Sequence, residues 1–203
     1  KIHACFEIDL LNIDTVEKTI KRATKFLKGV DVVLHAAGGG LGLKESLISS
    51  KDFQKLLNLN ILSAAEINRL VIPEMKKNKN GNIIHIGSIA SFESVGSVGY
   101  NSSKAAISAY VRTLGRELTI HNIIMTGVLP GGFMAPLNAM HRLKKNNKKV
   151  YNDFIKNRLP RKKMGNTNEL MPMIEFLASR SAGMMSGCLI PMDGGEGKSY
   201  FFR

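Results

Sequence analysis

Cysteine is scarce in this sequence: the 203 residues include only two, Cys5 and Cys188. The two lie far apart and form no CxxC pair, which excludes a disulfide framework and a cysteine zinc site and favours a reducing, cytoplasmic setting. The five histidines have no spacing that would gather a metal ion, so we expect no metal site. No run approaches the roughly 18 consecutive apolar residues of a membrane-spanning helix. We therefore expect no membrane partner.

Proline and periodic glycine are also in short supply. The 6 prolines and 19 scattered glycines exclude collagen-like, proline-rich and intrinsically disordered chains. Hydrophobic residues make up 44% of the chain, which is enough to bury a core. The length is that of one generous domain, and we expect residues 1–203 to form a single one.

Acidic residues are outnumbered: 16 Asp and Glu stand against 29 Lys and Arg, and the net charge is +13. Most of the excess lies in one stretch of 22 residues, where ten basic residues and a single acid, Asp153, give +9. The ten are Arg142, Lys144, Lys145, Lys148, Lys149, Lys156, Arg158, Arg161, Lys162 and Lys163. The stretch could be a solvated helical face, a lid over an anionic ligand, or a nucleic-acid surface. Only Tyr151 and Phe154 supply aromatic rings there, which argues against nucleic acid.

Short apolar runs alternate with longer amphipathic ones, a pattern typical of a parallel α/β sheet. The predicted buried strands are Ile2–Leu10, Val30–His35, Asn82–Ile86, Ile123–Leu129 and Cys188–Met192. The predicted helices are Thr15–Lys28, Ser50–Lys77, Tyr100–His121 and Asn168–Arg180. The basic stretch interrupts this alternation at the carboxyl side of a strand, where open α/β sheets bind their ligands. We predict that residues 133–165 form a basic substrate lid inserted into the domain.

The most informative local pattern is Tyr100-Asn-Ser-Ser-Lys104 at the start of a predicted helix. Residues at i and i+4 lie on the same helix face, so an ammonium here could stabilise the phenolate and lower its pKa. Ser88, at the carboxyl end of a predicted strand, could hold a carbonyl or alcohol oxygen beside the phenol. Together the three side chains predict a proton-transfer site for the carbonyl and alcohol couple.

Several patterns in this order resemble the short-chain dehydrogenase/reductase family from the third strand of that family to the C-terminus. His35-Ala-Ala-Gly38 is similar to its Asn-Asn-Ala-Gly turn, and Asn60, Ser88, Tyr100 and Lys104 match its catalytic tetrad. Pro130-Gly131 matches its Pro-Gly turn, and the run from Ser186 to Gly195 is similar to its closing strand. The resemblance implies a Rossmann-like, doubly wound parallel sheet in three α/β/α layers.

The same resemblance implies hydride transfer between a nicotinamide cofactor, NAD or NADP, and a carbonyl or secondary alcohol. Tyr100 would be the general acid or base, Lys104 would lower its pKa and hold the nicotinamide ribose, and Ser88 would position the substrate oxygen. Asn60 would support a water that links Lys104 to solvent. The residues implied to bind the cofactor are Asp9, Leu10, His35, Ala36, Gly38, Tyr100, Lys104, Pro130, Gly131 and Phe133.

The sequence also departs from the family pattern. The glycine-rich phosphate loop of the family lies before the region matched here, so we expect about 45 to 50 further N-terminal residues in the full protein. His35 stands where the family prefers Asn, and Ala135 stands where it uses Thr. Pro172 is unusual within the last predicted helix.

The implied substrate is anionic, and two classes suit a basic lid: an acyl thioester on an acidic carrier protein, and a nucleotide-linked or acidic sugar. We favour a 3-oxoacyl-thioester reductase. A member of the family that binds the dinucleotide as a sensor or scaffold, without turnover, is the alternative of another class. The resemblance also implies a homodimer or homotetramer that pairs through the helices at 50–77 and 100–121.

Overall fold

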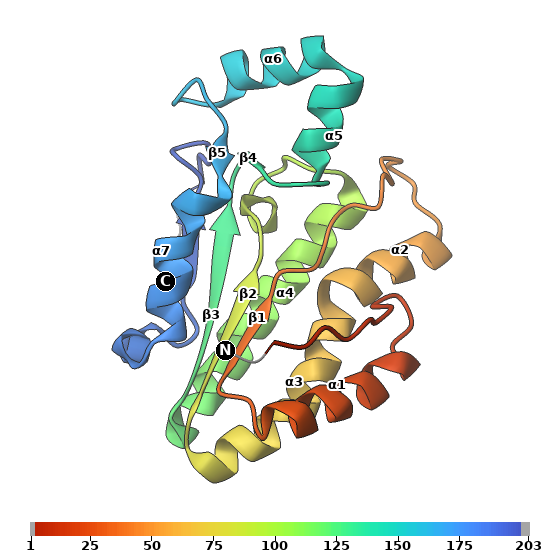
Figure 1. Ribbon diagram of the computed structural model, residues 1–203. Coiled ribbons are helices and arrows are strands. Elements are labelled where there is room, and N and C mark those ends of the chain that lie inside the picture. The colour runs from red at the N-terminus through yellow and green to blue at the C-terminus, as the bar shows by residue number, and fades with distance from the viewer. Residues whose placement is uncertain (1–2, 200–203) are drawn as a thin grey trace.

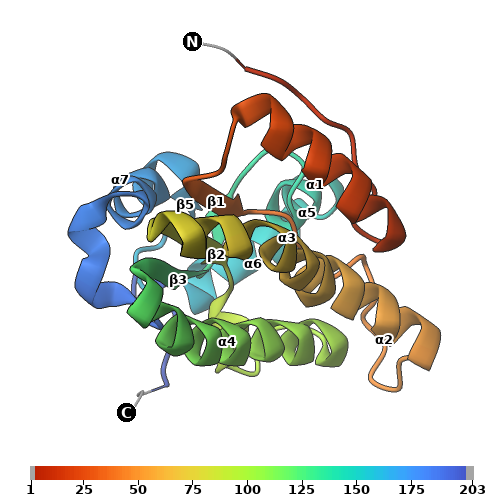
Figure 2. The same cartoon turned by 90° about the horizontal axis from the view of Figure 1, so that it is seen from below.

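Four parallel strands form the centre of the molecule, with helices on both faces (Figures 1 and 2). The computed structural model describes residues 3–199. The strands are β1 (Val32–His35), β2 (Gly81–Ile86), β3 (Ile123–Pro130) and β6 (Leu189–Met192). They are hydrogen-bonded in the order β1-β2-β3-β6, and every pair is parallel. The predicted α/β class is therefore confirmed.

The two helical layers are unequal (Figure 2). One comprises α1 (Asp14–Leu27), α2 (Ser50–Leu57), the π-helical turn η1 (Asn58–Leu62), α3 (Ser63–Asn78) and α4 (Val98–Leu118). The other holds α7 (Thr167–Ala178). Short turns η2 (Ile89–Ser91), η3 (Thr119–His121) and η4 (Arg180–Met185) complete the connections. The predicted helix from Ser50 is thus three consecutive helical segments.

Local signals explain where two of these helices begin. The Ser49 hydroxyl accepts the Asp52 backbone N–H over 3.1 Å, which caps the start of α2. Asn166 and Glu169 form a reciprocal capping box at the start of α7. The helix continues through Pro172 although proline cannot donate a backbone hydrogen bond.

The central strands are buried on both faces, and their side chains alternate between two cores. Ile83 packs with residues of α3 and α4, whereas its neighbour Ile84 packs with Leu177 of α7. Both isoleucines are fully buried, and every residue of β3 is buried. This explains the continuous apolar runs in the sequence, which are typical of parallel strands covered on both sides.

Strand β1 lies at one edge of the sheet and is less well covered than β2 and β3. Val32 and Leu34 are each 44% exposed. The predicted strand at Ile2–Leu10 is wrong for its described part, because residues 3–9 form no ladder and Leu10 begins a turn. A strand requires a neighbour for its backbone hydrogen bonds, and β1 pairs only with β2 among the described strands. Ile2 lies outside the described residues.

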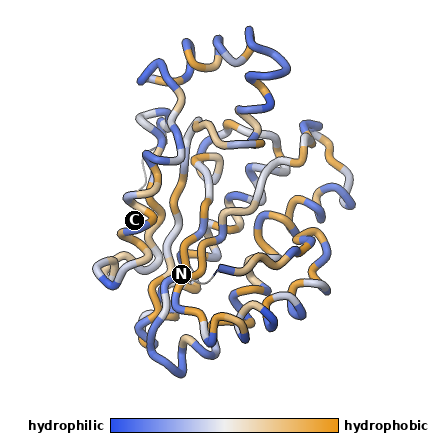
Figure 3. Tube along the Cα trace, viewed as in Figure 1, coloured by the Kyte–Doolittle hydropathy of each residue, from blue (hydrophilic) through white to orange (hydrophobic). Residues whose placement is uncertain are grey.

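The predicted lid stands above the carboxyl-terminal edge of the sheet (Figure 1). It begins in β4 (Phe133–Met134), continues through α5 (Ala139–Asn146) and α6 (Lys148–Arg158), and ends at β5 (Gly165–Asn166), which pairs with β4. Figure 3 shows that this segment is largely hydrophilic, unlike the strands below it. Among residues 3–199, no helix is long and apolar enough to cross a membrane.

Candidate active site

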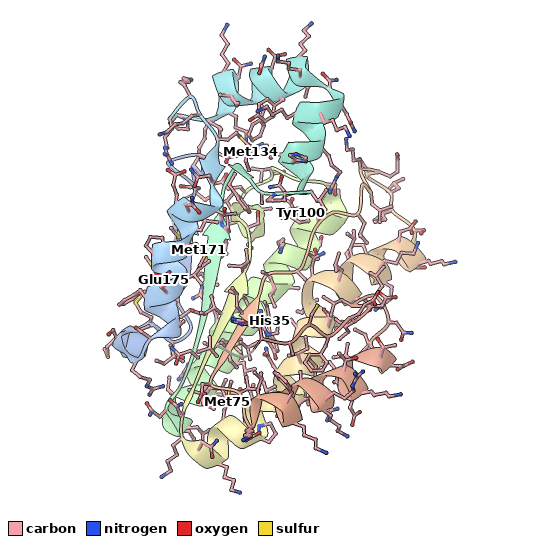
Figure 4. The ribbon with its side chains drawn as sticks, viewed as in Figure 1. His35, Met75, Tyr100, Met134, Met171 and Glu175 are labelled. Carbon is pink, nitrogen blue, oxygen red and sulfur yellow. The ribbon has the colours of Figure 1, made fainter. Side chains whose placement is uncertain are left out.

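Tyr100 lies near the start of α4, at the carboxyl-terminal edge of the sheet and beneath the lid (Figure 4). Strand β2 ends at Ile86, so Ser88 reaches the same edge, where its side chain lies close enough to the Tyr100 hydroxyl to lower the pKa of that phenol. Lys104 follows one helical turn after Tyr100, and its Nζ lies 5.8 Å from the centre of the Tyr100 ring. The Nζ also donates to the Ile86 carbonyl over 3.1 Å. The structure thus brings the three predicted proton-transfer residues together.

Asn60 lies in η1, the π-helical turn between α2 and α3. Such turns insert an extra residue into a helix and are frequent at functional sites. The Asn60 side chain is buried, and its Nδ2 donates to the carbonyls of Gly39 and Leu56, both over 2.9 Å. Its Oδ1 accepts the Gly39 N–H, also over 2.9 Å. Asn60 therefore fixes the glycine turn that follows β1.

Gly38 is where this turn requires glycine. Its φ of +157° is rarely adopted by other residues, and a Cβ there would lie 2.9 Å from Asn60 Oδ1 and 3.1 Å from Lys104 Nζ. A Cβ at Gly39 would meet nothing within 4 Å. The turn is therefore packed against the tetrad on one side and open on the other.

Burial dominates the electrostatics of the site. It lowers the pKa of Lys104 from 10.5 to about 8, because desolvation disfavours the ammonium form. Burial also raises the pKa of Tyr100, and the neighbouring Ser88 side chain opposes that shift. The expected lowering of the Tyr100 pKa by Lys104 is therefore wrong for the chain by itself. The ammonium lies over the ring and is bound to the Ile86 carbonyl, not to the phenol oxygen.

A buried polar cluster adjoins the site and was not predicted. The His35 ring stacks on the His85 ring with centroids 4.3 Å apart, and His35 Nε2 lies 2.8 Å from Asn68 Oδ1. The Asn68 amide also reaches His85 Nε2 and the Tyr110 hydroxyl, each at 3.3 Å. Burial lowers the pKa of both histidines. The His35 side chain is thus occupied inside the fold, and the implied cofactor contact at this position would fall to its backbone.

Asp9 and Leu10, two of the residues implied to bind the cofactor, lie just before α1. Asp9 Oδ1 accepts the Leu11 N–H over 2.9 Å, and the Asp9 carbonyl accepts the Asn12 N–H over 3.2 Å. The Asp9 carboxylate therefore stabilises a local turn, and the roles of Asp9 and Leu10 toward a cofactor remain predictions. Ala36 is exposed on the chain that leaves β1.

The Pro130-Gly131 pair lies at the carboxyl end of β3, whose last residue is Pro130, and the turn there involves a residue that the sequence reasoning missed. The next backbone N–H, that of Gly132, donates to Glu196 Oε2 over 2.5 Å. Glu196 Oε1 accepts from Arg158 Nε of α6 over 2.6 Å. An acid directly after Asp193-Gly194-Gly195, in a chain with few acids, was the signal that could have identified it.

A cavity of about 450 Å³ lies between α7, β6 and the base of the lid. Its wall includes Gly132 and Phe133 of the turn after β3, and Arg161 and Lys163 of the lid. Apolar side chains supply much of the remainder: Leu170, Met173, Ile190 and Met192. Glu169 and Asp193 also line it, so the cavity combines an apolar wall with side chains of both charges next to the turn that follows β3.

Comparison with known proteins gives consistent results. A family model described as short chain dehydrogenase matches residues 2–146. The chain is 28% identical over 195 residues to the 3-oxoacyl-[acyl-carrier-protein] reductase MabA of Mycobacterium tuberculosis, covering 96% of this chain and 76% of that protein. It is 32% identical over 171 residues to the 7alpha-hydroxysteroid dehydrogenase of Escherichia coli, covering 82% of this chain and 63% of that protein.

Solved structures share the fold. A 7 alpha-hydroxysteroid dehydrogenase complexed with NADH and 7-oxo glycochenodeoxycholic acid superimposes with a TM-score of 0.82 at 29% identity, covering 93% of this chain and 72% of that one. The L-sorbose reductase of Gluconobacter frateurii, complexed with NADPH and L-sorbose, gives a TM-score of 0.85 at 24% identity, covering 96% of this chain and 77% of that one.

Proposed function

The chain belongs to the short-chain dehydrogenase/reductase family and is an NAD(P)-dependent oxidoreductase, and we propose that it interconverts a carbonyl and a secondary alcohol with Tyr100 as the general acid or base. The observation that carries the proposal is the placement of Ser88 beside the Tyr100 hydroxyl, with the buried Lys104 one turn further along α4. These groups provide a proton donor, a hydroxyl that can hold an oxygen, and a cation in one place.

The residues at this edge fit the nicotinamide end of a dinucleotide. The side of the glycine turn at Gly39 is open, since an added Cβ would meet nothing within 4 Å. The Lys104 ammonium carries three N–H donors, and within residues 3–199 one of them donates to the Ile86 carbonyl. The ammonium can therefore also donate to a ribose hydroxyl, and the backbone of Pro130, Gly131 and Phe133 can face the carboxamide. The cofactor, when bound, supplies or accepts the hydride.

The chain's own residues manage the proton. In the direction of reduction, the Tyr100 hydroxyl gives its proton to the carbonyl oxygen, which the Ser88 hydroxyl holds by a hydrogen bond. The raised pKa of Tyr100 keeps the phenol protonated at neutral pH and therefore suits this direction. Asn60 keeps the adjoining turn in place while the proton is transferred.

We propose a 3-oxoacyl thioester as the substrate. The support comes from relatives named as 3-oxoacyl-[acyl-carrier-protein] reductases, of which the Aquifex aeolicus protein is a further example at 26% identity. A carrier-bound or coenzyme-bound acyl group is anionic, which is the charge that the net +9 of the lid would attract. The lid helices α5 and α6 stand over the edge where Tyr100 lies (Figures 1 and 4).

We further propose that the protein is a homodimer or homotetramer that pairs through α2–α3 and α4. Leu62 of the turn η1 between α2 and α3 and Val98 of α4 are 40% and 51% exposed, and such pairing would cover them. Sedimentation analysis should give a mass of at least two chains, and a Val98→Glu variant should shift it toward one chain. A monomeric wild-type protein would contradict this assignment.

The Tyr100→Phe variant tests the reaction. Turnover of an acetoacetyl thioester with NADPH or NADH should fall by about 1,000-fold, because a positioned general acid contributes roughly 100- to 10,000-fold. Dinucleotide affinity, measured by calorimetry, should change by no more than about twofold, because the phenol oxygen serves the substrate.

Tyr110→Phe is the matched control. Tyr110 lies on the same helix, and its hydroxyl contacts Asn68 rather than Ser88. The control should keep its turnover. Unchanged turnover in Tyr100→Phe would refute the mechanism, and dinucleotide binding without turnover in the wild-type protein would favour a sensor or scaffold.

A further inference from the structure

Glu196 has an environment unlike that of the other acids with recorded ion pairs in residues 3–199. Its side chain is 3% exposed, whereas the carboxylates of the other recorded ion pairs are between 20% and 47% exposed. It lies on the segment that follows β6, four residues after Met192. A buried carboxylate is tolerated only when its charge is paired and hydrogen-bonded.

The partners of Glu196 come from two different parts of the fold. Oε2 accepts the backbone N–H of Gly132, in the turn after β3, over 2.5 Å. Oε1 accepts from Arg158 Nε, in the last turn of lid helix α6, over 2.6 Å. One carboxylate thus joins the C-terminal segment, the proposed carboxamide-binding turn and the lid.

The glycine at position 131 permits this close approach. A Cβ at Gly131 would lie 2.6 Å from Glu196 Oε2, and one at Gly132 would lie 3.3 Å from the same oxygen. The Arg158 guanidinium is further supported by the Phe154 ring, whose centroid is 5.3 Å away. The contact is therefore built by several residues and does not depend on a single flexible side chain.

The lid has few other fixed points. Helix α5 has no buried residue, and α6 has one, Tyr151. Leu159 is buried just after α6. The second ion pair at the base of the lid, between Arg161 and Glu169, has side chains that are 35% and 38% exposed, and exposed pairs contribute little.

We propose that Glu196 is a positioning residue that locks lid helix α6 onto the Pro130–Gly132 turn. The lid is then held next to the cofactor-binding turn before substrate arrives, and substrate binding need not order it. The part of this inference that concerns substrate rests on the proposed function, whereas the locking of the lid does not.

The Glu196→Gln variant tests the lock by limited trypsin digestion, because the lid carries ten potential cleavage sites between Arg142 and Lys163. Glutamine keeps an oxygen for the Gly132 N–H but loses the charge that Arg158 needs. Cleavage within the lid should become at least about tenfold faster, since proteolysis follows the population of the open form. In turnover, KM should rise by about tenfold while kcat stays within about threefold.

Glu169→Gln is the matched control, because it removes the exposed ion pair with Arg161 and keeps a residue that can complete the capping box. It should leave lid cleavage within about twofold of wild type. Arg158→Gln, at a side chain that is 32% exposed, gives an independent measurement if Glu196→Gln folds poorly. The double variant should be no worse than the more affected single variant, because both remove the same contact.

Wild-type rates of lid cleavage in both Glu196→Gln and Arg158→Gln would overturn the proposal, as would equal acceleration in Glu169→Gln. Failure of the proposed function has a different signature. In that case the wild-type protein would not turn over a 3-oxoacyl thioester, while the Glu196 variant would still expose its lid to trypsin.

Discussion

The catalytic edge and the lid face each other, yet they are built on opposite principles. Asn60 and Lys104 at the edge are each 4% exposed and are held by hydrogen bonds to backbone carbonyls. The lid helices carry exposed charges and bury one side chain, Tyr151. The proposed proton-transfer groups are therefore positioned before any ligand binds, whereas the charges of the lid can act on a ligand over several ångströms.

The largest expected effect concerns the buried ammonium of the edge. Burial lowers the pKa of Lys104 to about 8 from 10.5, so between these values the unfolded chain binds more protons than the folded one. The free energy of unfolding must therefore rise with pH from about 8 to 10.5, by on the order of 3 kcal/mol. Below pH 8 both states hold the proton, and the penalty is constant.

Lys104→Met removes this contribution. The free energy of unfolding is measured by urea denaturation at several pH values for the wild type and for the variant. The wild-type value minus the variant value should increase by on the order of 3 kcal/mol between pH 8 and 10.5. Lys145→Met, at an exposed position of the lid, should reproduce the wild-type pH dependence. If Lys104→Met and Lys145→Met show the same dependence of the free energy of unfolding on pH, the contrast between a buried edge and a solvated lid is wrong.

The sequence was sufficient for the four central strands and for the pairing of Tyr100 with Lys104 because both depend on local patterns, whereas Asn60 was implied only by the family resemblance. Apolar runs indicate strands that are covered on both faces, and Tyr100 and Lys104 are neighbours on one helix whatever surrounds them. The expected strand before Leu10 was wrong because an apolar run requires a neighbouring strand, and no local pattern reports that requirement.

Contacts between segments that lie far apart in the sequence could not be predicted either, because no local pattern reports them. Asn68 meets His35 and His85 because α3 packs on two neighbouring strands. Glu196 meets Arg158 because the C-terminal segment passes beneath the lid. The raised pKa of Tyr100 could not be predicted either, since it depends on burial and not on the spacing to Lys104.

The next effect is steric and tests how tightly the glycine turn after β1 packs against the tetrad. Gly38→Ala should lower kcat/KM by about 100-fold, because displacement of catalytic groups by about 1 Å can have that effect. The added Cβ would lie 2.9 Å from Asn60 Oδ1 and 3.1 Å from Lys104 Nζ, at a φ of +157°. Steady-state kinetics with NADPH would measure the change.

Gly183→Ala serves as the control for this substitution, because a Cβ there meets nothing within 4 Å and the position lies in η4, away from the tetrad. Its activity should equal that of wild type. A Gly38→Ala enzyme with normal kcat/KM would mean that the glycine turn is less tightly packed against the tetrad than the structure indicates.

The smallest effect belongs to the lid. Changing Lys144, Lys145, Lys148 and Lys149 to Gln should raise KM for a coenzyme A thioester by about fivefold at low salt, with kcat unchanged, because the lost attraction is electrostatic. The difference should shrink at about 0.5 M salt, where charges are screened within a few ångströms. A neutral N-acetylcysteamine thioester should show no change in KM with either enzyme. Equal changes in KM for the charged and neutral thioesters would mean that the substitutions had altered the shape of the lid. No change in KM for either thioester would mean that these four lysines form a solvated helical face.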